Sequence, residues 1–255
     1  MGRQKQQQGF TIIEVMLFLA VTALLIMGIL GSVSNSINVQ RYREGVEGFR
    51  DFLAGQYESI NMLTNDRTAT QVCGGIQGHR GATDCFYSGK LIEIGPGETG
   101  AQEGRIEVSP VIAIKNTVPS PPPNDYTYKK VLEGNPGNVN IVTKEIDWGL
   151  FARESGTTTF DGNYYILITR HPDTGVTTVV TRKTVFTGGS NSADGLQDLP
   201  ASPAAMALST PSQDLKMCMI DKFNGLNPPE ILAVMIKAST TNPADIEVKS
   251  GECPR

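Results

Sequence analysis

The sequence predicts an α+β fold, in which one long N-terminal helix packs on a head built from an antiparallel β-sheet. An apolar run followed by an amphipathic segment, with no clear breaker between them, opens the chain and predicts one continuous helix. The remainder consists of short apolar segments separated by Gly- and Pro-rich stretches, a pattern typical of strands and loops. We find no internal repeat.

The first element is the apolar run from Phe10 to Leu30, which contains one charged residue, Glu14. As a helix it spans about 31 Å, which matches the hydrocarbon core of a bilayer. Arg3 and Lys5 precede it, so the N-terminal end is expected in the cytoplasm and the rest of the chain outside. Gly9 precedes the run and no A-x-A-like site follows it, unlike a secretory signal peptide.

Glu14 is anomalous within this run. A carboxylate in an apolar membrane segment costs on the order of a few kcal/mol unless it finds a partner, so it is a functional hypothesis by default. The alternative is a shallow glutamate whose carboxylate reaches the membrane interface.

The segment around Glu14 resembles a known family. Gly9 to Leu17, GFTIIEVML, follows a short basic leader and resembles the signal of type IV prepilins. The resemblance implies that a prepilin peptidase cuts between Gly9 and Phe10 and that the new Phe10 amine is methylated. It also implies that Glu14 partners the amine of a neighbouring subunit during assembly, where each buried charge offsets the desolvation of the other.

The helix is expected to continue beyond the membrane to Leu63 and to stop near Asn65. Apolar residues recur there at spacings of three and four, which predicts one buried face: Tyr42, Val46, Phe49, Leu53, Tyr57, Ile60 and Leu63. Small residues permit close helix packing, but they are also tolerated without a role; both interpretations apply to Gly28, Gly31, Gly45, Gly48 and Gly55. The expected division is a leader at 1–9, a transmembrane half at 10–30, an amphipathic half at 31–64 and an extracytoplasmic head at 65–255.

In the head, alternating apolar residues predict strands at 86–94, 105–114, 139–146, 164–169, 176–186, 215–220, 231–238 and 246–248. The segment His171 to Gly175 is a turn signal, so 164–186 is expected to form a hairpin. Asn116 to Asp125 is Pro-rich and predicts a loop. Thr187 to Gln213 is rich in Gly, Ser, Ala and Pro, and predicts a long surface loop.

The chain has four cysteines, all in the head, and their spacing matches no zinc site. An even number in an exported chain predicts two disulfides, for which three pairings exist. We favour the local pairs Cys73–Cys85 and Cys218–Cys253 over four free thiols. The second pair resembles, in its placement, the C-terminal disulfide loop of many pilins.

No feature indicates an enzyme, and we expect no metal and no cofactor. Gly95 to Gly100 reads G-x-G-x-x-G, but another strand follows where a nucleotide-binding loop needs a helix. His79 and His171 lie in loops and are expected to be solvated. Asn191, Ser192, Asp194 and Asp198 offer oxygens for Ca²⁺ without EF-hand spacing, so a solvated loop is favoured.

The charge argues against nucleic acid as a partner, because the net charge is −4. Two local basic groups are the alternative: Arg41, Arg43 and Arg50, or Lys129 and Lys130.

Together these observations predict a structural subunit, a minor pilin or pseudopilin of a type IV pilus or type II secretion-like filament. Its expected partners are other pilin subunits, in a homo- or hetero-filament, the prepilin peptidase and the inner membrane. One alternative is a single-pass anchored protein that binds an extracellular ligand or DNA without assembling. Another is an anchored enzyme whose catalytic cluster forms only in three dimensions.

Overall fold

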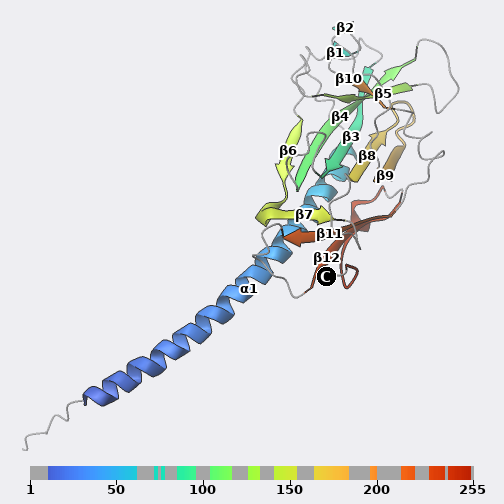
Figure 1. Cartoon of the computed structure of the whole chain (residues 1–255). Coiled ribbons are helices and arrows are strands. Elements are labelled where there is room, and N and C mark those ends of the chain that lie inside the picture. Colours follow the sequence, from blue (N-terminus) through green and yellow to red (C-terminus); the bar gives the residue numbers. More distant parts are fainter. Residues whose placement is uncertain are drawn as a thin grey trace, which may run out of the picture.

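One helix dominates the molecule and projects far beyond the rest of it (Figure 1). It is α1, which runs without interruption from Ile12 to Asn61. The structure is a computed structural model of the whole chain, and it describes residues 11–61, 72–73, 76–77, 85–95, 104–116, 126–132, 141–153, 164–183, 196–199, 214–221, 230–238 and 241–253. The expected helix end between Leu63 and Asn65 lies outside these residues.

The start of α1 has a side-chain cap. The Glu14 amide donates to the Thr11 hydroxyl oxygen at 3.3 Å, and the Glu14 and Val15 amides both donate to the Thr11 carbonyl. Thr11 and Glu14 therefore have the spacing of a capping box, which satisfies amide groups that the first helical turn leaves without partners.

The head contains a large antiparallel sheet of seven strands, in the order β10-β5-β4-β3-β8-β9, with β6 also paired to β4. Its central strands β3, β4 and β8 are long and buried, and they lie along the upper part of α1 (Figure 1). The strand bounds are β3 Cys85–Ile94, β4 Arg105–Lys115, β5 Tyr126–Val131, β6 Val142–Glu145, β8 Tyr164–Arg170, β9 Thr177–Arg182 and β10 Leu196–Asp198.

A second antiparallel sheet of four strands, in the order β13-β12-β11-β7, lies where α1 leaves the head (Figure 1). Its strands are β7 Leu150–Arg153, β11 Leu215–Asp221, β12 Leu232–Ile236 and β13 Ile246–Ser250. Two 3₁₀ turns flank it, η1 Asp147–Gly149 and η2 Pro243–Asp245. A short pair, β1 Val72–Cys73 and β2 Ile76–Gln77, completes the described elements.

These elements confirm the predicted α+β fold. The expected hairpin is present, because β8 pairs with β9 in antiparallel register from Tyr165 opposite Arg182 to Arg170 opposite Thr177. Strands β3, β4, β11, β12 and β13 also match predicted segments closely, and β6 occupies part of the weak prediction at 139–146.

Five described strands, β1, β2, β5, β7 and β10, were not predicted from the sequence. Strands β5 and β7 were not predicted, because Tyr126–Val131 contains two lysines and Leu150–Arg153 is short. The prediction of one long loop from Thr187 to Gln213 is wrong at Leu196–Asp198, which forms the edge strand β10 on β5. An edge strand needs only one paired neighbour, so polar residues such as Gln197 are tolerated there.

The main core lies between the upper half of α1 and the two sheets. The predicted stripe is buried as far as the structure describes it, from Tyr42 to Ile60, while Leu63 lies outside the described residues. Its partners come from both sheets and include Ile92, Ile166, Met217, Val234 and Ile246. A second buried cluster, with Leu91, Val111, Tyr165 and Leu199 among its members, lies on the opposite face of the large sheet.

Candidate assembly site on the stem helix

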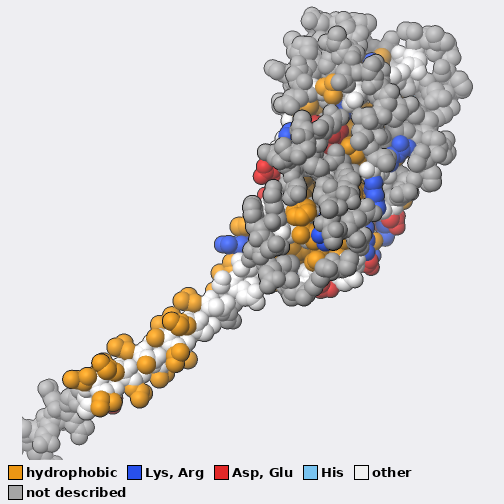
Figure 2. All heavy atoms as spheres, viewed as in Figure 1, with side chains coloured by type: hydrophobic (Ala, Val, Ile, Leu, Met, Phe, Trp, Pro, Cys, Tyr) orange, Lys and Arg blue, Asp and Glu red, His pale blue; other side chains and the backbone are white. Residues whose placement is uncertain are grey.

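The lower half of α1 has no cover from its own chain. All the large hydrophobic residues from Ile12 to Leu30 are exposed, and Leu24 is 71% exposed. Figure 2 shows this half as a rod covered with apolar side chains. Among the described residues, α1 is the one helix long and apolar enough to cross a membrane. This surface requires lipid or another apolar partner.

Glu14 lies in the first turn of this rod, and its side chain is exposed. A carboxylate there lies near the positive end of the helix dipole, which is a favourable position for an anionic side chain. The other predicted processing residues, Gly9 and Phe10, lie outside the described residues. The pairing of Glu14 with a neighbouring amine therefore stays a prediction.

The upper half of α1 is fixed to the smaller sheet through Tyr42. Its hydroxyl donates to the Met219 carbonyl oxygen at 2.8 Å and accepts from the Leu232 amide at 2.7 Å. One side chain thus joins the helix to both β11 and β12. Burial raises the pKa of Tyr42 to about 12, while the hydrogen bond from Leu232 acts in the opposite direction.

The far end of α1 is attached to the large sheet by Lys90 of β3. Its ammonium donates to the Gln56 side-chain oxygen at 2.8 Å and to the Ser59 hydroxyl at 2.7 Å. Burial lowers the pKa of Lys90 below its ordinary value. Tyr57, nearby on the helix, is buried, and its hydroxyl has no hydrogen-bond partner among the described residues. Burial also raises the pKa of Tyr57.

The five helix glycines differ in how much space surrounds them. A Cβ on Gly45 would lie 2.7 Å from Cδ1 of Leu150 and 3.2 Å from the carbonyl oxygen of Asp147, so Gly45 permits close packing of η1. A Cβ on Gly28, Gly31 or Gly55 would meet nothing within 4 Å. A Cβ on Gly48 would lie 3.6 Å from Oδ2 of Asp147, which is an ordinary contact. Within the described chain, the close-packing interpretation thus applies to Gly45, while packing of Gly28 and Gly31 on other helices stays a prediction.

The cysteines of the last strands are joined. Cys218 of β11 and Cys253 form a disulfide with an S–S distance of 2.00 Å, and the Lys216–Glu252 ion pair at 2.9 Å lies beside it. Cys85 is also disulfide-bonded. The side chain of Cys73 lies outside what the structure describes, so the pair Cys73–Cys85 stays a prediction.

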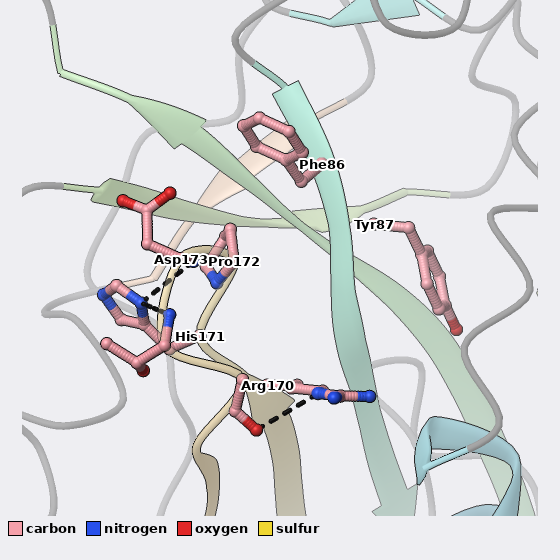
Figure 3. Close-up of a pocket in the computed structure, with 8 residues that line it drawn as sticks. Phe86, Tyr87, Arg170, His171, Pro172 and Asp173 are labelled. Carbon is pink, nitrogen blue, oxygen red and sulfur yellow. Dashed lines mark hydrogen bonds between the residues drawn. The ribbon is translucent and has the colours of Figure 1, made fainter.

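His171 is less exposed than a freely solvated side chain. It is half-buried at the tip of the β8–β9 hairpin, and its ring packs edge-to-face on Tyr126 at 5.3 Å between centroids. Its Nδ1 accepts the Asp173 and Thr174 amides, both at 3.3 Å. His171 therefore stabilises the turn beside a hollow of about 440 Å³ that Phe86 and Arg170 also line (Figure 3).

The other sequence candidates do not form a site in the described part of the chain. No group of three or more His, Cys, Asp or Glu that would hold a metal occurs among the described residues. His79, the segment 96–100 and the loop residues Asn191, Ser192 and Asp194 lie outside those residues, and so does the side chain of Asp198 in β10.

The possible basic patch at Lys129 and Lys130 requires two exposed lysines, and the structure contradicts this for Lys130. Lys130 is buried on the large sheet, where its ammonium forms ion pairs with Glu93 and, at 3.6 Å, with Glu107. Arg50 pairs with Asp51, Arg41 lies over the indole ring of Trp148, and Arg43 is exposed.

Comparison with known proteins adds one match, to the N-terminal segment. The family model for the prokaryotic N-terminal methylation motif matches residues 4–30, the segment that contains Glu14 and the bare apolar run. The chain carries the type IV prepilin-like signature. No curated protein and no solved structure matches the chain. The prepilin-like signature implies processing by a prepilin peptidase and assembly with pilins in general, and the apolar helix fits a membrane anchor.

Proposed function

We propose that this chain is a structural subunit, a minor pilin or pseudopilin, of a type IV pilus or type II secretion-like filament. The observation that carries the proposal is the division of α1 into two environments. The head buries one face of the upper half of the helix, whereas the lower half bears the methylation motif and has no cover. A stem of this kind is made to be covered by lipid before assembly and by other stems after it.

The proposed assembly uses a heterologous contact, in which one side of a stem packs on a different side of its neighbour. Such contacts do not close and generate an open helical filament. The lower half of α1 suits this role because it is apolar on every side, as a helix surrounded by neighbours must be. The proposed segments are the leader at 1–9, the transmembrane half at 10–30, the amphipathic half at 31–64 and an extracytoplasmic head at 65–255.

Glu14 is proposed to guide the stem into register. Cleavage between Gly9 and Phe10 creates a new amine next to the helix, and a neighbouring Glu14 offsets its charge. Either charge buried alone costs several kcal/mol, roughly, so a subunit at the wrong height is penalised. The proposed Cys73–Cys85 disulfide and the observed Cys218–Cys253 disulfide would stabilise the head during export.

The proposed processing is tested by mass spectrometry of the full-length protein from cells with and without the prepilin peptidase. We expect a mature chain that begins at methylated Phe10, and an intact chain from Met1 when the peptidase is absent. The variant Gly9→Val serves as the matched control and should keep its leader in both strains. A native chain that begins at Met1 in peptidase-containing cells would contradict the proposal and favour a non-assembling, ligand-binding membrane protein.

The proposed role of Glu14 is tested by recovery in sheared filaments. Glu14→Ala should enter filaments poorly although it still reaches the membrane. Glu58→Ala is the control, because Glu58 is an exposed acid on the same helix within the head region. If Glu14→Ala enters filaments as efficiently as the control, the proposed charge pairing is wrong.

A further inference from the structure

The turn η1 holds an unusual residue at the base of the head. Trp148 adopts φ 62° and ψ 22°, in the left-handed region, and it is the one non-glycine residue with positive φ among those the structure describes. Bulky side chains rarely adopt this conformation. Trp148 is nevertheless 48% exposed. A strained backbone that presents a large apolar ring to solvent points to a function outside the fold of the monomer.

The surrounding contacts fix the ring in place. The Arg41 guanidinium of α1 lies over the indole, 5.1 Å from its centroid. The close approach of η1 at Gly45 holds the turn on the helix. Lys144, just before η1, interacts with Asp147 at 3.5 Å and lies over the Phe52 ring at 5.4 Å. The indole is thus presented as a rigid feature, which keeps the entropic cost of binding a partner low.

Trp148 stands at the end of an exposed stripe of α1. At 100° per residue, Leu30, Val33, Ile37 and Arg41 fall within a sector about 80° wide. The three apolar members are exposed, and the Arg41 guanidinium lies over the indole of Trp148. We define Leu30, Val33, Ile37, Arg41 and Trp148 as the collar ridge. It continues the bare surface of the anchor upward to the head without a break.

The position of Trp148 excludes the hydrocarbon of the membrane as its cover. Arg41 lies eleven residues beyond Leu30, or about 16 Å further along the helix axis. The headgroup region outside the hydrocarbon is only about 5–8 Å thick on each side. The intervening Ser34, Asn35 and Ser36 are polar, as expected of a segment outside lipid. A neighbouring stem, in contrast, runs along the same axis and extends past this height.

We propose that the collar ridge packs against the stem of a neighbouring subunit in the same filament, and that Trp148 contributes most to the affinity of this contact. The inference rests on the proposed function, because only assembly brings a second stem to this height. Continuity with the bare half of α1 is its main support. Charge adds to it, since Arg41 of the ridge is exposed, and the upper part of a stem like this one exposes Glu44 and Glu47. Tryptophan and arginine are also the residues most often dominant in interfaces.

The variant Trp148→Gly separates docking from folding. Glycine accepts φ 62° without strain, so the variant removes the indole and should keep the head folded. We expect unchanged protease resistance in detergent, together with about a tenfold loss of the full-length chain from sheared filaments. Val176→Gly is the control, because Val176 is a similarly exposed residue at the hairpin of the head, and it should enter filaments normally. Normal incorporation of Trp148→Gly would overturn the proposal.

Photo-crosslinking gives an independent measurement in assembled filaments. A benzophenone amino acid replaces Leu24, Trp148 or Val176 in separate full-length chains. We expect irradiated filaments to show adducts with a pilin stem from positions 24 and 148, but none from position 176. Adducts from position 24 alone, or adducts from position 148 with a protein that is not a pilin, would contradict the proposed contact between the collar ridge and a neighbouring stem. Either result would leave the proposed function intact. Failure of the native chain to appear in filaments at all would instead contradict the proposed function.

Discussion

The two halves of α1 are both rich in apolar residues, yet they have opposite environments. In the upper half, Val46, Leu53 and Ile60 are fully buried against the head. In the lower half, Ile12 is 77% exposed and Leu24 is 71% exposed. The helix itself does not change between them, since its backbone continues from Ile12 to Asn61.

The difference lies in how the apolar residues are distributed around the helix. In the upper half they form one stripe, which fits a head that approaches from one side and leaves the other faces to water. In the lower half they surround the helix, which fits an environment that is apolar in all directions. The comparison teaches that the head completes only half of the stem, and that the other half depends on lipid or on other subunits.

Truncating one leucine in each half gives the largest expected contrast. Leu53→Ala should lower the free energy of unfolding by about 2–5 kcal/mol, because it opens a cavity in the core. Leu24→Ala should change it by less than about 0.5 kcal/mol, because Leu24 contacts no part of the head. Denaturant unfolding of both full-length variants in the same detergent measures the difference. Equal losses would mean that the lower half also stabilises the fold of the monomer.

Two tyrosines sharpen the comparison within the buried half. Tyr42→Phe leaves the Met219 carbonyl and the Leu232 amide without their partner, so it should cost about 1–3 kcal/mol. Tyr57→Phe removes a hydroxyl that makes no hydrogen bond among the described residues, so it should be neutral or stabilising. Chemical denaturation of the two variants provides the test. A larger loss for Tyr57→Phe would show that its hydroxyl has a partner after all.

Alkaline pH should weaken the contact of Tyr42 with the smaller sheet. The pKa of Tyr42 is raised to about 12 in the folded chain, against about 10 for an unfolded tyrosine. Its contribution is therefore complete below pH 10, and it is lost as the pH rises from there through about 12. The stability difference between the native chain and Tyr42→Phe should shrink over this interval when unfolding is followed from pH 8 to 11.5. A constant difference would argue against the raised pKa.

The sequence contained most of what defines the stem. The apolar run, the position of Glu14 and the spacing from Tyr42 to Ile60 follow from local periodicity, which a sequence displays directly. The hairpin after Tyr164 was predictable for the same reason, because its turn residues lie between two apolar strands.

The details that attach the stem to the head could not be read in this way. Tyr42 finds its partners 177 and 190 residues away, so no local pattern reveals them. Trp148 has the sequence context Asp-Trp-Gly, and only the adjacent Gly149 suggests a left-handed turn. The pairing of Lys130 with Glu93 joins two strands of the sheet and turns a lysine that looked exposed into a buried one.

The smallest expected effects come from the helix glycines, and their signs differ. Gly45→Ala should cost about 1 kcal/mol, because overpacking against Leu150 and Asp147 outweighs the gain in helix propensity. Gly55→Ala should stabilise the chain by about 0.5–1 kcal/mol, because a Cβ there meets nothing and alanine is the better helix former. Denaturation of the two variants, side by side with the native chain, measures both signs. If both variants gain stability, η1 can move away from the helix to make room for the added methyl group. The contacts at Gly45 would then not hold Trp148 rigidly at the base of the head.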